Sequence, residues 1–313
     1  MSNPPPTAPS NPGPRWGYRF LCACDRVLPE KIFRPIRALG TWIAVAAMPG
    51  QRNHSRAYLS IVLGRPPTWR EVWRHFFSFE EFLMLKLRVA AGRPHRCVLA
   101  PDTPDNIRAW LAANRPALLG TFHLGHSDLV GFLLGGHEHR RIFMIRQHVG
   151  NSHDTESLGA LFGDWVTFIW VNEADNLLFA LKDAVATGGS IAMKCDRLEF
   201  SAKTEVFDFL GAPRVFPFTI YHLALIFGLP VVLSVGVANG PGQSVLHAAP
   251  LFTPGPGAPK SAELARARAH FQAFLSQLET LLRADPFPWF NFTPLNPVAP
   301  ARDPGRLAGL PPA

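Results

Sequence analysis

The sequence is poor in cysteine, and no apolar run is long enough to cross a membrane. Its 313 residues include four cysteines, which form neither a disulfide framework nor a Cys-x-x-Cys metal pattern. The longest apolar stretch near the N-terminus, Leu39 to Met48, has about half of the roughly 20 residues that a spanning helix needs. Residues 1–14 are Pro-rich and lack the charged start and apolar core of a signal peptide. We therefore expect a protein of a reducing compartment that does not span the membrane.

Charge is also scarce, and what there is lies mostly at one end. Charged residues make up 17% of the chain and hydrophobic residues 47%. The formal charge is +8, and Arg15–Arg96 alone contains 15 Lys or Arg against 5 Asp or Glu. This imbalance favours an anionic partner: a phospholipid surface, a phosphorylated substrate or an acidic carrier protein. Nucleic acid is not expected, because the basic residues alternate with Phe, Trp and Leu and no nucleic-acid module is present.

Residues 15–100 form a basic, aromatic region whose first part, Arg15–Ala47, is broken at Pro29 and Pro35. Its apolar side chains recur at helical spacing between Arg and Lys, which is the composition of a helix lying at a membrane interface. Packing of the same face against the protein core predicts the same pattern. We expect N-terminal helices that dock the protein on a lipid surface, with core packing as the alternative.

The rest of the chain alternates strands with helices, which predicts an α/β core over 101–293 with a central, mostly parallel sheet flanked by helices. Strands are expected at 116–120, 141–145, 166–171, 190–193, 231–237 and 247–252. Helices are expected at 50–63, 69–91, 102–114, 155–162, 176–187, 216–227 and 262–283. Residues 1–14 are expected to be disordered, and the Pro-rich tail 294–313 to be loose. No internal repeat is present.

The most informative stretch is Thr121-Phe-His-Leu-Gly-His-Ser-Asp-Leu129, which lies between two apolar runs, 116–120 and 130–134. The first run is short and bounded by Pro and Gly, which predicts a buried strand. The second predicts the first turns of a buried helix, with Ser127 or Asp128 as its N-cap. His123 then lies in a strand-to-helix turn, where backbone amides and a polar side chain can meet a substrate.

His123 and Asp128 are five residues apart, which on one continuous helix would place them roughly 140° from the same face. With His123 in the turn and Asp128 in the first helical turn, the carboxylate can reach the imidazole, and Gly125 gives the loop the freedom this requires. A carboxylate on one ring nitrogen fixes the tautomer and stabilises the imidazolium formed when the other nitrogen takes a proton. The pair is a candidate general base for a hydroxyl, with the amides around Leu124 and Gly125 as candidate donors to an oxyanion.

His-x-x-x-x-Asp after an apolar strand resembles the signature of the glycerolipid and lipid A acyltransferases. The stretch His123-Leu-Gly-His-Ser-Asp128 is most similar to the late (lauroyl or myristoyl) acyltransferases of lipid A biosynthesis, which typically have His-Phe-Gly-Asn-Trp-Glu. Further landmarks follow in the order of that family, over roughly Arg52–Pro288. They are Arg146 after a strand, Asp196-Arg197 after a Gly and a strand, Gly211-Ala-Pro213, and Gly228-Leu-Pro before a Val-rich strand.

The resemblance implies a fold like that of the glycerolipid acyltransferases, with His123 and Asp128 as catalytic residues. The residues it implies for substrate binding are Gly125, Arg146, Asp196 and Arg197. Arg146 and Arg197 would hold a phosphate of donor or acceptor, and Asp196 would orient one of them. A structural ion pair is the alternative for these three.

The activity that the resemblance implies is transfer of a fatty acyl group from a thioester, of acyl carrier protein or coenzyme A, to a hydroxyl. The acceptor would be a lipid A-type glycolipid, or another glycolipid or lysolipid. No metal or cofactor is expected beyond the thioester co-substrate. The protein would lie peripherally on the cytoplasmic face of the bacterial inner membrane.

Three other functions remain open from the residues. A metal-dependent hydrolase would draw ligands from His123, His126 and Asp128, with His137, His139, His148 or His153. A serine hydrolase is suggested by Gly125-His-Ser-Asp-Leu129, although the nucleophile elbow requires Gly where Leu129 stands. A lipid-binding protein without catalysis would use the same apolar surfaces with an inert His123.

Overall fold

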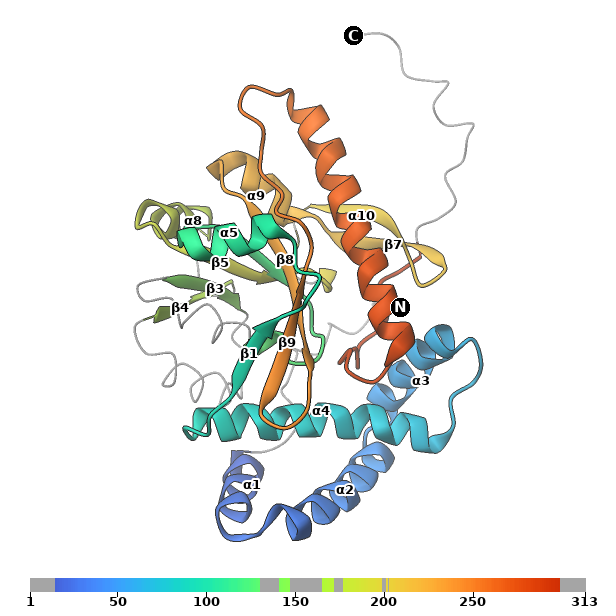
Figure 1. Ribbon diagram of the computed structural model, residues 1–313. Coiled ribbons are helices and arrows are strands. Elements are labelled where there is room, and N and C mark those ends of the chain that lie inside the picture. The colour runs from blue at the N-terminus through green and yellow to red at the C-terminus, as the bar shows by residue number, and fades with distance from the viewer. Residues whose placement is uncertain are drawn as a thin grey trace, which may run out of the picture.

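The computed structural model describes residues 15–129, 141–146, 165–171, 177–198, 201 and 203–298. A seven-stranded sheet with helices on both faces forms its centre (Figure 1). The strand order is β1-β9-β8-β2-β5-β3-β4. The strands are β1 (Arg96–Leu99), β2 (Leu118–Thr121), β3 (Ile142–Arg146), β4 (Val166–Trp170), β5 (Ser190–Lys194), β8 (Val231–Ala238) and β9 (Gln243–Ala248).

Five neighbouring strands, β8-β2-β5-β3-β4, run parallel to one another. Strand β9 is antiparallel to β8, and β1 is parallel to β9. The expected α/β fold with a mostly parallel sheet is therefore confirmed. The carboxyl ends of the five parallel strands meet at one edge, which is where ligands bind in open α/β sheets.

The described helices cover both faces of the sheet and its carboxyl edge. They are α1 (Arg15–Val27), α2 (Glu30–Ala47), α3 (Pro49–Leu63), α4 (Trp69–Ala90), α5 (Asp105–Ala113), α8 (Leu177–Ala186), α9 (Thr219–Phe227) and α10 (Lys260–Ala284), with the 3-10 turn η1 (Ser127–Leu129). Helix α4 crosses the lower end of the sheet in Figure 1, and α1 and α2 lie beyond it. A capping box of Thr68 and Glu71 fixes the start of α4.

Alternate residues of the central strands face two separate cores, as the period of a β-strand requires. Leu118, Ile191 and Leu233 point into the larger core, which α8, α9 and α10 cover. Leu119 and Val232 point to the other face, where α5 packs. Because both faces are buried, these strands are continuous apolar runs, and their sequences predicted them well.

The structure also has elements that the sequence did not predict. These are β1 and an antiparallel hairpin of β6 (Thr204–Phe209) and β7 (Ala212–Pro217). The hairpin takes up Phe216, which was expected to begin a helix, and α9 starts three residues later. Strand β9 ends at Ala248, so the strand expected at 247–252 was wrong in its bounds. The predictions for 1–14, 130–134, 155–162 and 299–313 lie outside the described residues.

The expectation of a loose tail from Pro294 is wrong for its first residues. Arg214 Nη1 donates to the carbonyl of Asn296 at 3.0 Å, and Val215 N donates to Pro297 O at 3.1 Å. Val298 forms an isolated β-bridge with Arg214. Residues 286–298, which we call the C-terminal segment, are thus fixed against the hairpin and, as shown below, against the site.

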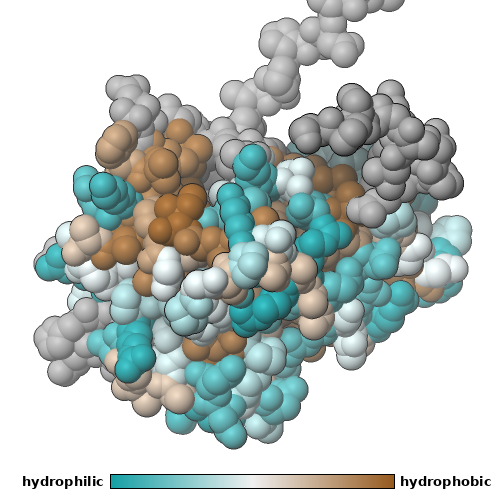
Figure 2. Space-filling model, turned by 90° about the horizontal axis from the view of Figure 1, so that it is seen from above, coloured by the Kyte–Doolittle hydropathy of each residue, from teal (hydrophilic) through white to brown (hydrophobic). Residues whose placement is uncertain are grey.

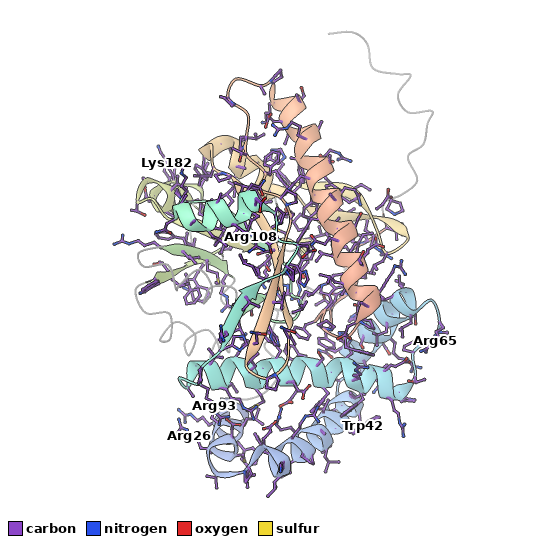
Figure 3. The ribbon with its side chains drawn as sticks, viewed as in Figure 1. Arg26, Trp42, Arg65, Arg93, Arg108 and Lys182 are labelled. Carbon is purple, nitrogen blue, oxygen red and sulfur yellow. The ribbon has the colours of Figure 1, made fainter. Side chains whose placement is uncertain are left out.

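Helix α2 has a buried inner side and an exposed, apolar outer side. Its inner side faces α4 through the buried residues Phe33, Arg37, Thr41 and Val45. Arg37 donates to Glu80 of α4 at 2.7 Å and to Glu30 at 2.5 Å, which ties the two helices together. The outer side exposes Ile32, Leu39 and Ile43. Trp42 stacks on Trp73 of α4, and Figure 3 shows it between the two helices, far from Arg26 at the end of α1.

Within the part of the chain that the structure describes, no helix combines the length and the hydropathy that crossing a membrane requires.

Candidate active site

Strand register places His123 opposite Asp196. In the parallel pair of β2 and β5, Thr121 is the partner of Lys194, and Cys195 N donates to Thr121 O at 2.8 Å. Continuing this register by two residues brings His123, which follows β2, beside Asp196, which follows β5. The two side chains come from different strands and meet at the carboxyl edge of the sheet.

The carboxylate of Asp196 holds His123 at three points. Its Oδ1 lies 2.8 Å from His123 Nδ1, its Oδ2 lies 3.1 Å from the same nitrogen, and Oδ2 also accepts from the backbone N–H of His123 at 2.8 Å. A carboxylate only accepts, so Nδ1 carries the ring proton and Nε2 presents a lone pair. No residue in the described part of the chain hydrogen-bonds to Nε2, and the side chain of His123 is 31% exposed.

Electrostatics keep the imidazole neutral and the carboxylate charged. Burial lowers the pKa of His123 below its usual 6.5, and Arg197 and Lys194 add to this, while Asp196 opposes them. Burial would raise the pKa of Asp196, but His123, Arg197 and Lys194 outweigh it and hold that pKa far below its usual range. At neutral pH the pair is therefore a neutral base beside a permanent anion, which is the state a general base needs before it takes a proton.

The C-terminal segment forms the back of this site. Pro288 O accepts from Gly125 N at 2.6 Å, and Phe290 N donates to His123 O at 2.8 Å, on either side of a β-bridge between Leu124 and Trp289. The indole Nε1–H of Trp289 donates to Asp196 Oδ2 at 3.3 Å. The side-chain amide of Asn296 donates to the backbone carbonyl of Asp196 at 3.0 Å. The predicted loop around His123 is thus a strand-like edge held by residues far along the chain.

Asp128 is not the partner of His123, and this corrects the prediction from the motif. Its Oδ1 lies 2.6 Å from Lys194 Nζ, and its Oδ2 lies 3.3 Å from Lys86 Nζ of α4. Burial would raise the pKa of Asp128, but Lys194, Lys86 and Arg146 hold it well below its usual range. Because Lys194 Nζ also donates to Phe122 O at 3.0 Å, Asp128 acts on the loop before His123 through this lysine.

Gly125 also has a different role from the expected one. Its backbone lies at φ +49°, and a Cβ there would lie 2.5 Å from Gly236 O of β8. His126 N donates to that same carbonyl at 2.8 Å. A glycine is needed here so that the loop can lie against β8. Since Gly125 N is bound to Pro288, the structure excludes it as a free oxyanion donor. Leu124 is among the residues that line the cavity, and its backbone N–H has no acceptor among the described residues.

The two predicted arginines do lie at the carboxyl edge. Arg146 ends β3, and its guanidinium lies 5.5 Å from the ring centre of Phe168 on β4. Arg197 follows Asp196, and its Nη2 contacts Phe290 O at 3.4 Å. Both line the cavity described next. Asp196 was expected to orient one of them; its direct hydrogen bonds are with His123 and Trp289 instead.

A cavity of about 1220 Å³ opens on His123. This is larger than the roughly 300–1,000 Å³ of typical small-molecule pockets. Its polar end holds His123, Asp128, Lys86, Lys194, Arg146 and Arg197. Its apolar walls include Phe33 of α2, Phe79 and Leu83 of α4, and Phe290 and Phe292 of the C-terminal segment, together with side chains of the sheet and of α5, α8 and α9. The arrangement suits a ligand with a polar, reactive end and a long apolar part.

The neighbours of His123 in the motif have structural roles. His126 Nδ1 is 2.7 Å from Ser244 Oγ, and the ring stacks on Phe82. Ser127 is buried; its hydroxyl donates to Leu124 O and accepts from Gly236 N, so it is not a nucleophile. Among the described residues no group of three His, Cys, Asp or Glu side chains forms a metal site. The four further histidines considered as ligands lie outside those residues.

Sequence reasoning missed Lys86, Lys194 and Trp289. Lys194 had a usable signal, because it ends a predicted strand one residue before the Cys195-Asp196 pair. Lys86 and Trp289 had no such signal, since each reaches the site from an element whose position depends on tertiary packing.

No protein-family model matches this chain, and no curated protein is detectably similar to it in sequence. The fold and the site define an α/β protein with a His–carboxylate pair whose imidazole lines a largely apolar cavity.

Proposed function

We propose that this protein is an acyltransferase that moves a fatty acyl group from a thioester to a hydroxyl of a lipid acceptor. The observation that carries the proposal is the His123–Asp196 pair, whose free nitrogen adjoins a large cavity with apolar walls. The resemblance of the motif to lipid A acyltransferases names a lipid A-type glycolipid, or a related lipid, as acceptor. The same resemblance names acyl carrier protein or coenzyme A as the carrier of the thioester.

In the proposed reaction His123 Nε2 takes the proton of the acceptor hydroxyl as its oxygen attacks the thioester carbonyl carbon. Asp196 stabilises the imidazolium that forms. The tetrahedral oxyanion is met by the amide of Leu124 and by the positive charge of Arg197. When the intermediate collapses, the C–S bond breaks and the leaving thiolate receives the proton from Nε2. The products are an ester and a free thiol, and His123 is neutral again.

The positively charged side chains that line the cavity favour the binding of an anionic substrate. Lys86, Lys194, Arg146 and Arg197 lie at its polar end, with Asp128 and Asp196 as the carboxylates among the described residues there. Arg146 and Arg197 are in place to meet a phosphate of the acceptor or of the thioester carrier, because guanidinium groups bind phosphate with two parallel hydrogen bonds.

The test is direct. Purified protein is incubated with membrane lipids and an isotope-labelled acyl thioester, and the acylated lipid is identified by mass spectrometry. The variant His123→Ala should lose about 10² to 10⁴ of the rate, as expected for removal of a proton-transfer catalyst. Circular dichroism and thermal melting of the variant check that it is folded. Wild-type turnover by a folded H123A protein would sink the proposal.

We also propose that helix α2 places the cavity at a membrane surface. Its outer side exposes Ile32 (54%), Leu39 (64%) and Ile43 (65%), and the sequence from Ala38 to Gly50 contains no charged residue. Exposed basic residues of the same layer are Arg19, Arg26, Lys31 and Arg34. An apolar strip near basic side chains is the pattern of a helix that lies in the headgroup region of an anionic bilayer. The inner side of α2 lines the cavity, so a lipid substrate has a short path into it.

Vesicle binding tests this part. The double variant L39E/I43E should bind vesicles that contain phosphatidylglycerol about 10-fold or more weakly than the wild type, because two apolar side chains lose their burial. Ile226 of α9 is 63% exposed and supplies the matched control, I226E. Helix α9 lies at the top of Figure 1 and α2 at the bottom. The end of the molecule opposite α2 faces the viewer in Figure 2, and apolar and polar areas alternate on it. Equal loss of binding in both variants would contradict a role for α2.

A further inference from the structure

Trp289 is the least expected residue in contact with the site. It is 2% exposed and lies in the C-terminal segment, paired with Leu124. Its indole N–H donates to Asp196 Oδ2, the oxygen that also accepts from the backbone N–H of His123. Both carboxylate oxygens lie near His123 Nδ1, but Oδ1, at 2.8 Å, is closer than Oδ2, at 3.1 Å. Because the indole N–H holds Oδ2, it helps to set the orientation of the carboxylate against the ring.

The N-terminal helices hold Trp289 in turn. Tyr58 of α3 packs edge-on against the indole, with ring centres 5.1 Å apart. His75 of α4 is fully buried, and its Nε2 lies 2.8 Å from the carbonyl oxygen of Trp289. Because that oxygen only accepts, Nε2 donates, and His75 Nδ1 accepts from Ser55 Oγ at 2.8 Å. Burial lowers the pKa of His75 to about 4, so this neutral tautomer is the one present at neutral pH.

We propose that Trp289 is a positioning residue for the catalytic pair: its indole N–H orients Asp196 against His123, and α3 and α4 hold the indole in place. The kinetic part of this inference rests on the proposed acyl transfer. The structural part does not, because it concerns only how the carboxylate and the imidazole interact. A chain of buried contacts thus joins the N-terminal helices to the base: Ser55, His75, Trp289, Asp196 and His123.

The physical expectation follows from what the indole does to the carboxylate. An N–H donor stabilises the negative charge of Asp196 and so weakens its attraction for the imidazolium form of His123. In Trp289→Phe that donor is lost while an aromatic ring remains. The pKa of His123 should then rise, by about half a unit if the lost bond is of ordinary strength. The carboxylate also loses a restraint on its orientation, so kcat should fall about 10-fold with KM little changed, in the range found for residues that orient a functional group from behind.

The matched control is Trp73→Phe. Trp73 also donates its indole N–H, in this case to the backbone carbonyl of Ala38 at 3.1 Å, and its ring stacks on Phe77 in α4. The control loses an indole hydrogen bond outside the site. Both variants are compared with the wild type by nuclear magnetic resonance titration of ¹⁵N-labelled histidine, with the His123 signals assigned from the spectrum of H123Q. A pH profile of kcat/KM is measured in parallel.

An upward shift of the His123 pKa in W289F and none in W73F supports the proposal. Equal pKa values for His123 in all three proteins would overturn it. If W289F fails to fold, benzothienylalanine at position 289 keeps the two-ring shape and removes only the N–H, so the same titration applies. A shifted His123 pKa in a protein without acyl transfer would refute the proposed function and leave the role of Trp289 standing.

Discussion

Two carboxylates lie near His123 at the carboxyl edge of the sheet, the buried one of Asp196 and the partly buried one of Asp128, and they have different partners. Asp196 faces the imidazole, a group that changes charge near neutral pH, with Nδ1 at 2.8 Å. Asp128 faces the ammonium groups of Lys194, at 2.6 Å, and of Lys86, at 3.3 Å. In both cases neighbouring positive charge outweighs burial and lowers the pKa of the carboxylate. Both are therefore anions at neutral pH, but only one is placed to respond to proton transfer.

The difference shows that a sequence motif and strand register give different information. The His-x-x-x-x-Asp motif concerns a single loop, in which Asp128 is close to His123 in sequence. The pairing of β2 with β5 decides which carboxylate reaches the ring, and it brings Asp196 there. Asp128 supports the general base indirectly. It binds Lys194, whose Nζ also donates to Phe122 O, next to His123. The predictions below test this division of roles.

The largest expected effect is on rate. Asp196→Asn keeps the shape of the side chain but removes the charge that fixes the tautomer of His123 and stabilises its imidazolium form. We expect kcat to fall about 10³-fold, within the range for an acid–base group that loses its orienting carboxylate. Asp128→Asn should cost about 10-fold, because it acts only through Lys194. Single-turnover acyl transfer measures both, and a larger loss in D128N than in D196N would reverse the assignment.

The effect on stability should have the opposite order. In D128N two ammonium groups lose their shared anion in a largely buried place, where Lys86 is 9% exposed. Breaking such a pair typically costs about 3 kcal/mol. In D196N the side-chain oxygen of the amide can still accept from the N–H groups of His123 and Trp289, so we expect about 1 kcal/mol. Urea unfolding followed by fluorescence gives both free energies, and equal values would show that the lysine cluster contributes little.

The same residues show how much of the site can be predicted from the sequence alone. It located His123, because a short apolar strand followed by a Gly-containing turn is a local pattern. It placed Arg146 and Asp196-Arg197 after strands correctly, because apolar runs mark strand ends. It could not show that β5, and not β3, lies beside β2, since strand order depends on packing of the whole sheet. For the same reason it could not bring Trp289 or Lys86 to the site, and it took Asn296 for part of a loose tail.

A smaller effect separates the role of Asp128 in the ion cluster from any direct role at the ring. In the double variant D128L/K194M two apolar side chains replace the closest ion pair. If Asp128 serves mainly to balance Lys194, the double variant should be more stable than the sum of the two single changes by about 1–3 kcal/mol. The four proteins of this double-mutant cycle are compared by urea unfolding. Strict additivity would mean that the 2.6 Å contact between the two side chains carries no net coupling.

The smallest effect is on pH dependence, and it isolates the pair most cleanly. Neutral His123 is the active form, and burial lowers its pKa below 6.5, so kcat/KM should be flat through pH 7 and fall only as pH drops through that lowered value. Asp196 raises the pKa of His123 and so opposes the effect of burial. In D196N the pH at which kcat/KM falls should therefore be lower still. Asp128 is not among the groups that shift the pKa of His123, so in D128N this pH should stay within about 0.3 of the wild-type value. A profile that moves in D128N but not in D196N would return Asp128 to the role that the motif first suggested.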